Sequence, residues 1–256
     1  MHSNHLFHKT QGQGEPLVLI HGLFGSHDNL GMIARLLAEH FTVYSIDLPN
    51  HGRSPHSQST NLDQMVAQVS LWLDSVGLDC THILGHSLGG KVAMEMALRY
   101  PDRVKQLIIM DIAPVLYQSQ HNSVFEGLLA IDVEKLNSRS EADQILKAYV
   151  EELPVRSFLL KNLSKNPQGN YAWRMNLSAL YDGYSQLIRE NSEGARFEGK
   201  TLFLKGGNSD YIQDSHKDAI LNRFPATSLK VVANTGHWLH AEKPEIIAKL
   251  AIKFLS

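Results

Sequence analysis

Short runs of apolar and β-branched residues alternate along the chain with longer stretches of helical pattern. Each short run is bounded by Gly, Pro, Asn or Asp, as strands usually are. The predicted strands are Leu17–His21, Thr42–Asp47, His82–Gly85, Gln106–Asp111, Thr201–Lys205 and Ser228–Ala233. The predicted helices are Leu30–His40, Leu62–Val76, Leu88–Tyr100, Ser215–Phe224 and Pro244–Leu255.

This order of elements favours one fold class. Apolar strands separated by helices are typical of a parallel sheet with helices on both faces. We therefore expect an α/β protein with a doubly wound, mostly parallel sheet. The stretch His5–Thr10 is expected to add an antiparallel strand at the edge of this sheet.

The alternation is interrupted between Ala113 and about Glu198, where no strand is predicted. The helical windows of this region are Ser123–Ile131, Glu141–Leu153, Ser157–Leu163 and Leu177–Glu190. Ser140 is a candidate N-cap for the second window, because Asp143 follows three residues later. The region is too long for an ordinary loop. We expect it to be a helical lid, residues 113–198, inserted into a core formed by residues 1–112 and 199–256.

Composition narrows the class of protein. The chain has 256 residues, of which 43% are hydrophobic and 20% charged, as in ordinary globular proteins. Its net charge of −2 gives no support to a dedicated nucleic-acid binder. The single cysteine, Cys80, excludes an internal disulfide and a zinc site of cysteine pairs, and is expected to be a small core residue. No metal site is expected.

The N-terminus has no basic-then-apolar signal region, and no apolar run there is long enough to cross a membrane. These features indicate a soluble protein of a reducing compartment, the cytoplasm.

The segment Gly85–Gly89 has the pattern G-x-S-x-G between a predicted strand and a predicted helix. A strand that runs directly into a helix needs a sharp turn, and its apex residue has strained backbone angles. The apex hydroxyl of Ser87 is thereby exposed at the carboxyl end of the sheet, beside the free N–H groups of a helix N-terminus. Ser87 is therefore a candidate nucleophile. Lys91, in the following helix, is expected to be solvated.

A second motif, His21–Gly25, follows the first parallel strand. A glycine-rich turn at this position allows a backbone N–H to face Ser87. The Leu23 N–H, or alternatively that of Phe24, would then form an oxyanion hole together with the Leu88 N–H.

His237 lies in a Gly-His-Trp segment between the last strand and the last helix, 150 residues after Ser87. A histidine in this loop can act as general base toward the serine. The residues leave the acid open: Asp111 ends the strand after the nucleophile helix, and Asp210 follows the next strand, with Asp214 as a weaker candidate.

Together these motifs resemble the α/β-hydrolase superfamily, and within it the small bacterial YbfF-type esterases. The closer resemblance depends on HGLFGSHDNLG (His21–Gly31), MDIAPV (Met110–Val115), GGNS (Gly206–Ser209) and GHWLHAEKP (Gly236–Pro244). It implies a cofactor-free serine hydrolase that acts on small-molecule acyl esters, and also suggests acyl-CoA thioesters. It further implies that Asp111 is the acid and Asp210 is not.

The sequence thus predicts an esterase with a Ser87–His237–Asp111 triad. Thioester or carbon–carbon bond hydrolysis on the same triad is the first alternative, and a non-enzymatic small-molecule receptor is the second. Aromatic residues near the motifs are candidates for substrate binding, with core packing as the competing interpretation. They are Phe24, Trp238 and Tyr181, together with Trp173 and Tyr184 of the insertion.

Overall fold

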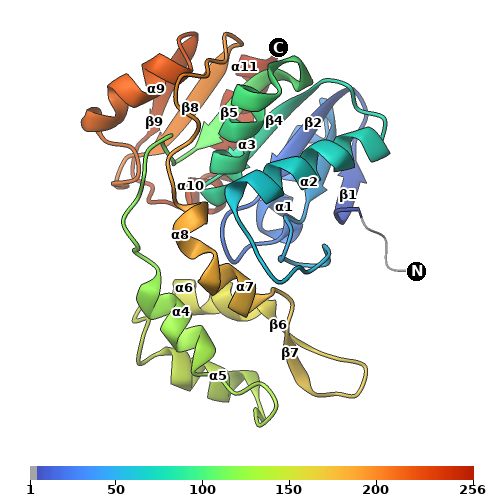
Figure 1. Cartoon of the computed structure of the whole chain (residues 1–256), viewed down its shortest axis with the longest axis vertical. Helices are drawn as coiled ribbons and strands as arrows, with labels where there is room; N and C mark the ends of the chain where they lie inside the picture. The colour runs from blue at the N-terminus through green and yellow to red at the C-terminus, as the bar shows by residue number, and fades with distance from the viewer. Residues whose placement is uncertain (1–4) are drawn as a thin grey trace.

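A computed structural model describes residues 5–256 and contains a seven-stranded sheet in the order β1-β3-β2-β4-β5-β8-β9 (Figure 1). Strand β1 pairs with β3 in antiparallel fashion, and every other pairing in this sheet is parallel. The strands are β1 His8–Gln11, β2 Glu15–Ile20, β3 Phe41–Ile46, β4 Thr81–His86, β5 Val104–Met110, β8 Thr201–Gly206 and β9 Thr227–Val232. The predicted fold class and the antiparallel edge strand are confirmed.

Helices cover both faces of the sheet. The helices of the core are α1 Gly31–Leu37, α2 Leu62–Ser75, α3 Leu88–Arg99, α9 Lys217–Arg223, α10 Leu239–Glu242 and α11 Pro244–Leu255. Short 3-10 turns are η1 His27–Leu30, η2 Pro101–Arg103 and η4 Asp214–His216. Helix α11 has its predicted bounds, with Pro244 in its first turn, where a fixed φ is suitable.

Alternate residues of the central strands face opposite helical layers, because successive side chains of a strand point to opposite sides. Leu17 and Leu19 of β2 pack in the cluster that holds α1 and α11. Val18 and Ile20 pack in the cluster that holds α2, α3 and α9. Burial on both faces explains why β2 is an almost continuous apolar run.

The segment between β5 and β8 forms a separate layer beyond one end of the sheet (Figure 1). Its elements are α4 Asn122–Leu129, α5 Arg139–Leu146, α6 Leu153–Leu159, η3 Leu160–Asn162, β6 Leu163–Lys165, β7 Tyr171–Trp173, α7 Leu177–Asp182 and α8 Tyr184–Leu187. We call residues 113–198 the insertion. The expectation that it contains no strand is wrong, since β6 and β7 form a hairpin. Three-residue strands are too short to give a hydrophobic period.

Three local expectations are corrected as well. Ser138, and not Ser140, caps α5 by accepting a hydrogen bond from the Glu141 N–H, so that helix begins earlier and ends at Leu146. The helix expected at Ser157–Leu163 begins at Leu153, because a proline stands in its first turn. Cys80 is exposed in the turn before β4 and does not belong to the core.

No helix within residues 5–256 has both the length and the apolar character needed to cross a bilayer.

Several buried histidines predict a loss of stability toward acid. The pKa of His240 is lowered to about 3 by burial and by the nearby His237, and burial and His21 lower that of His51 to about 3. The pKa of a histidine in the unfolded chain is 6.5. Below this pH the unfolded chain binds protons that the two buried histidines of the folded protein do not bind. The free energy of unfolding therefore decreases as the pH falls. Each such histidine contributes about 1.4 kcal/mol per pH unit to this decrease in the free energy of unfolding.

Urea unfolding of wild type and His240→Leu between pH 5.5 and 4.5 measures the contribution of His240 to the pH dependence of the free energy of unfolding. The variant should lose free energy of unfolding less steeply, by about 1.4 kcal/mol per pH unit. Equal slopes in the two proteins would show that His240 is not held neutral by the fold.

Candidate active site

Ser87 occupies the turn between β4 and α3, with φ 52° and ψ −118°. Positive φ is strained for a residue with a side chain. The flanking glycines are required: a side-chain carbon at Gly85 would collide with the Gly89 carbonyl, and one at Gly89 would collide with the Ile20 carbonyl. The Ser87 N–H donates to the Met110 carbonyl at 3.1 Å, which anchors the turn to β5. The partly exposed Ser87 hydroxyl makes no hydrogen bond within the part of the chain that the structure describes.

The loop after β2 passes directly beside Ser87. A side-chain carbon on Gly22 would lie 3.2 Å from the Ser87 Cβ, so only glycine allows this approach without displacement. His21 fixes the loop, because its Nδ1 donates to the Gly22 carbonyl at 2.8 Å and its Nε2 accepts from the Leu48 N–H at 3.0 Å. From the insertion, Asn162 donates to the Phe24 carbonyl at 2.7 Å. The loop backbone is therefore held from both the core and the insertion.

His237 lies in the loop between β9 and α10, next to the turn that carries Ser87. Its Nδ1 donates to Asp111 Oδ2 at 2.8 Å. Its carbonyl accepts from His86 Nε2 at 2.9 Å, which connects the loop to the residue before Ser87. Because Nδ1 is occupied as a donor, Nε2 is left as the ring's free acceptor.

Asp111 follows β5 with φ 53° and is completely buried. Besides His237, its carboxylate accepts from the Gly206 N–H at 2.9 Å and from the Ser209 hydroxyl. Asp210 is exposed, and no hydrogen bond joins its carboxylate to His237 among the described residues. The structure therefore brings Asp111, and not Asp210, to the imidazole.

Ser209 is a site residue that the sequence reasoning missed. It is buried, and its hydroxyl is one of three donors to Asp111. In the sequence, the Gly-Gly-Asn-Ser stretch stands out only through the family resemblance. A serine in a glycine-rich turn has no pattern that would reveal this contact.

A pocket with about 420 Å³ of empty space, part of it open to solvent, lies between Ser87 and the insertion. Leu23 and Leu88, whose N–H groups are the expected oxyanion donors, line it together with Ser87. Other walls come from Ile112, Tyr117, His121, Tyr184, Leu187 and Tyr211. His121 shares a hydrogen bond of 2.6 Å with the Tyr184 hydroxyl, and burial lowers its pKa to about 4, so it is neutral near pH 7.

The structure places three expected pocket side chains outside this lining. Phe24 is buried against Phe125, with ring centroids 4.9 Å apart. Trp238 packs on Phe158 at 5.4 Å. Tyr181 is 47% exposed on the outer side of α7. Of the aromatic candidates in the insertion, Tyr184 lines the pocket.

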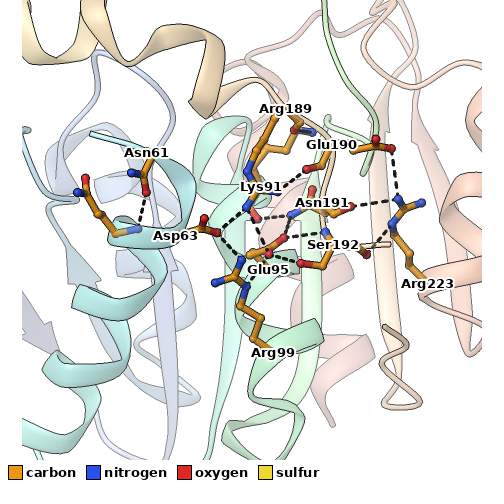
Figure 2. A network of polar contacts seen from close by, with 11 residues as sticks. Asn61, Asp63, Lys91, Glu95, Arg99, Arg189, Glu190, Asn191, Ser192 and Arg223 are labelled. Carbon is orange, nitrogen blue, oxygen red and sulfur yellow. Dashed lines mark hydrogen bonds and ion pairs between the residues drawn. The ribbon is translucent and has the colours of Figure 1, made fainter. Parts of the chain in front are cut away.

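Lys91 lies one helical turn after Ser87 (Figure 2). The expectation that it is solvated is wrong, because the side chain is buried. Its ammonium group donates to the carbonyls of Val115 and Arg189, which lie in the two segments that join the insertion to the core. Burial and the nearby Arg189 lower the Lys91 pKa to about 7. The insertion covers this face of α3, and such a long-range contact leaves no trace in the local sequence.

Glu95, one turn further along α3, holds the second of these segments. Its carboxylate accepts from the Asn191 side chain at 2.9 Å, from the Ser192 N–H at 3.1 Å and from Arg99 at 2.7 Å (Figure 2). The helix that begins at Ser87 is thus also the helix to which the insertion is attached.

The described residues contain no group of three His, Cys, Asp or Glu side chains arranged to hold a metal ion. They do contain a partly exposed serine on a strained turn, a histidine in a neighbouring loop and a buried carboxylate that binds this histidine.

Known proteins similar to this chain include hydrolases. The chain matches the family described as alpha/beta hydrolase fold over residues 15–244. It is 34% identical over 249 residues to the esterase YbfF of Escherichia coli, covering 97% of this chain and 96% of that protein. It is 36% identical over 248 residues to an sn-1-specific diacylglycerol lipase of Mus musculus, covering 94% and 80%.

A solved structure titled marine microorganism esterase superposes with a TM-score of 0.94 at 37% identity, covering 98% of this chain and 99% of that one. The chain therefore belongs to the alpha/beta hydrolase fold family. Within that family it is a hydrolytic enzyme of the esterase and lipase type, and the receptor alternative is set aside.

Proposed function

We propose that this enzyme hydrolyses small-molecule carboxylic esters through an acyl-enzyme intermediate, with Ser87, His237 and Asp111 as its triad. The observation that carries the proposal is the 2.8 Å hydrogen bond from His237 Nδ1 to the buried Asp111 carboxylate, next to the Ser87 turn. The chain order serine, acid, histidine and the contact of the histidine with the acid support this proposal.

In the first half-reaction the Ser87 hydroxyl attacks the acyl carbon while His237 Nε2 takes its proton. The C–O bond to the alcohol then breaks, and the imidazolium returns the proton to the leaving oxygen. In the second half-reaction His237 removes a proton from water as the water attacks the acyl carbon. The bond from that carbon to Ser87 Oγ then breaks, the imidazolium returns the proton to Ser87 Oγ, and the carboxylic acid leaves. Asp111 stays ionised throughout and stabilises the imidazolium.

The negative oxygen of each tetrahedral intermediate needs two preorganised donors. We assign these to the backbone N–H groups of Leu23 and Leu88. Support comes from the close approach of Gly22 to Ser87 and from the position of both leucines in the wall of the Ser87 pocket.

We further propose that residues 113–198 act as a lid over a catalytic core formed by residues 1–112 and 199–256. The insertion supplies Tyr117, His121 and Tyr184 to the pocket, so the substrate would lie between it and the sheet. Acyl esters are the proposed substrates, and acyl-CoA thioesters are compatible with the same chemistry.

Replacement of the nucleophile tests the reaction directly. Ser87→Ala should lower the turnover of a short 4-nitrophenyl ester by roughly 10³-fold or more, because only binding and the oxyanion donors remain. The melting temperature should be unchanged, since alanine is as strained as serine at this φ and the Ser87 hydroxyl makes no hydrogen bond among the described residues. Near-normal turnover by purified, folded Ser87→Ala would refute the assignment.

The choice of acid is tested by two matched substitutions. Asp111→Asn should lower kcat by about 10⁴-fold, because an amide at this position favours the wrong imidazole tautomer. Asp210→Asn, on the exposed neighbouring turn, should change kcat by less than about threefold. Both are measured on one ester, with folding checked by thermal melts. A large loss of kcat in Asp210→Asn and not in Asp111→Asn would show that Asp210 is the acid of the triad.

A further inference from the structure

The ring of Tyr211 lies flat against the imidazole of His237. The two ring centroids are 3.8 Å apart and their planes differ by 17°. Tyr211 follows β8 and also lines the pocket that contains Ser87. An aromatic ring therefore covers one face of the proposed base within reach of the substrate.

A hydrogen bond at Nδ1 alone does not fix the imidazole. The ring can tilt about the line from Nδ1 to Asp111 Oδ2, and such a tilt changes the direction in which Nε2 points. The His86 ring is a looser neighbour, with its centroid 4.8 Å from that of His237 and its plane inclined by 42°. The contact with Tyr211 is the closer and the more nearly parallel of the two.

Tyr211 is itself held by a residue at the start of the insertion. The Tyr117 hydroxyl donates to the Tyr211 carbonyl at 2.5 Å and accepts from the Ala113 N–H at 2.8 Å. The Lys91 ammonium, which belongs to the network drawn in Figure 2, lies 5.2 Å from the centre of the Tyr117 ring. A continuous set of contacts thus joins helix α3, the first segment of the insertion, Tyr211 and His237.

We propose that Tyr211 is a positioning residue for the His237 base, and that Tyr117 holds Tyr211 in place. The proposal rests on the proposed function, in which His237 transfers the proton. The stacked ring sets the plane of the imidazole, and the electron-rich face of the phenol also stabilises the imidazolium formed in each half-reaction. The Tyr211 hydroxyl makes no hydrogen bond within the described residues, so the ring and not the hydroxyl does this.

Tyr211→Leu removes the stack while keeping an apolar side chain. A misplacement of the base by about 1 Å can cost about 10²-fold in rate. We therefore expect kcat on a short 4-nitrophenyl ester to fall by about 10- to 100-fold, with KM within about threefold of wild type. Tyr211→Phe retains the ring and should restore most of the kcat that Tyr211→Leu loses. Tyr117→Phe removes only the hydroxyl tie and should lower kcat by about 3- to 10-fold.

A spectroscopic signal separates positioning from general loss of structure. The His237 Nδ1 proton, bonded to a buried carboxylate, should give a strongly downfield proton NMR resonance in wild type and Tyr211→Phe. It should be broadened or absent in Tyr211→Leu. Tyr100→Leu, at a surface tyrosine at the end of α3, is the matched control and should leave kcat and the resonance unchanged. If Tyr211→Leu does not fold, Tyr211→Met replaces it.

Three results would overturn the proposal: wild-type kcat in folded Tyr211→Leu or Tyr211→Met, an equal loss in Tyr211→Phe, or an effect confined to KM. The last would make Tyr211 a pocket wall only. Failure here is distinguishable from failure of the triad, because the triad is tested by Ser87→Ala, Asp111→Asn and Asp210→Asn, none of which changes Tyr211.

Discussion

The buried carboxylate of Asp111 is the contact on which the arrangement of the site depends. A charge with no exposure must be compensated by hydrogen bonds, and here three groups supply them: the Gly206 N–H, the Ser209 hydroxyl and His237 Nδ1. These donors come from the end of β8, from the turn that follows it and from the loop after β9. Satisfying one carboxylate therefore brings the ends of β5 and β8 and the loop after β9 together at one edge of the sheet.

A second constraint acts on Ser87, the proposed nucleophile. The positive φ of Ser87 is tolerated because glycines at positions 85 and 89 remove the collisions around it and the Met110 carbonyl binds its N–H. Helix α3, which follows Ser87, also holds the insertion. Its residues Lys91 and Glu95 bind the two segments that join the insertion to the core. The Ser87 turn, helix α3 and the insertion are therefore connected by direct contacts beside the pocket.

Much of the fold and the core of the site could be predicted from the sequence. The strands, helix α11 and the Ser87 turn have strong local patterns, because their burial and their glycines are dictated within a few residues. The contacts that were missed are non-local. Lys91 is buried because the insertion covers it, and Ser209 meets Asp111 only when two strand ends are adjacent. The choice between Asp111 and Asp210 likewise depended on resemblance, since both follow strands of the same sheet.

The central claim is that Ser87 is the activated nucleophile of this enzyme. The most direct measurement is peptide mass mapping after reaction with a fluorophosphonate, which forms a bond to an activated serine that water does not readily release. The account predicts that wild-type protein carries the probe on the peptide that contains Ser87. Probe on a different residue, or no probe on protein that hydrolyses esters at full rate, would contradict it.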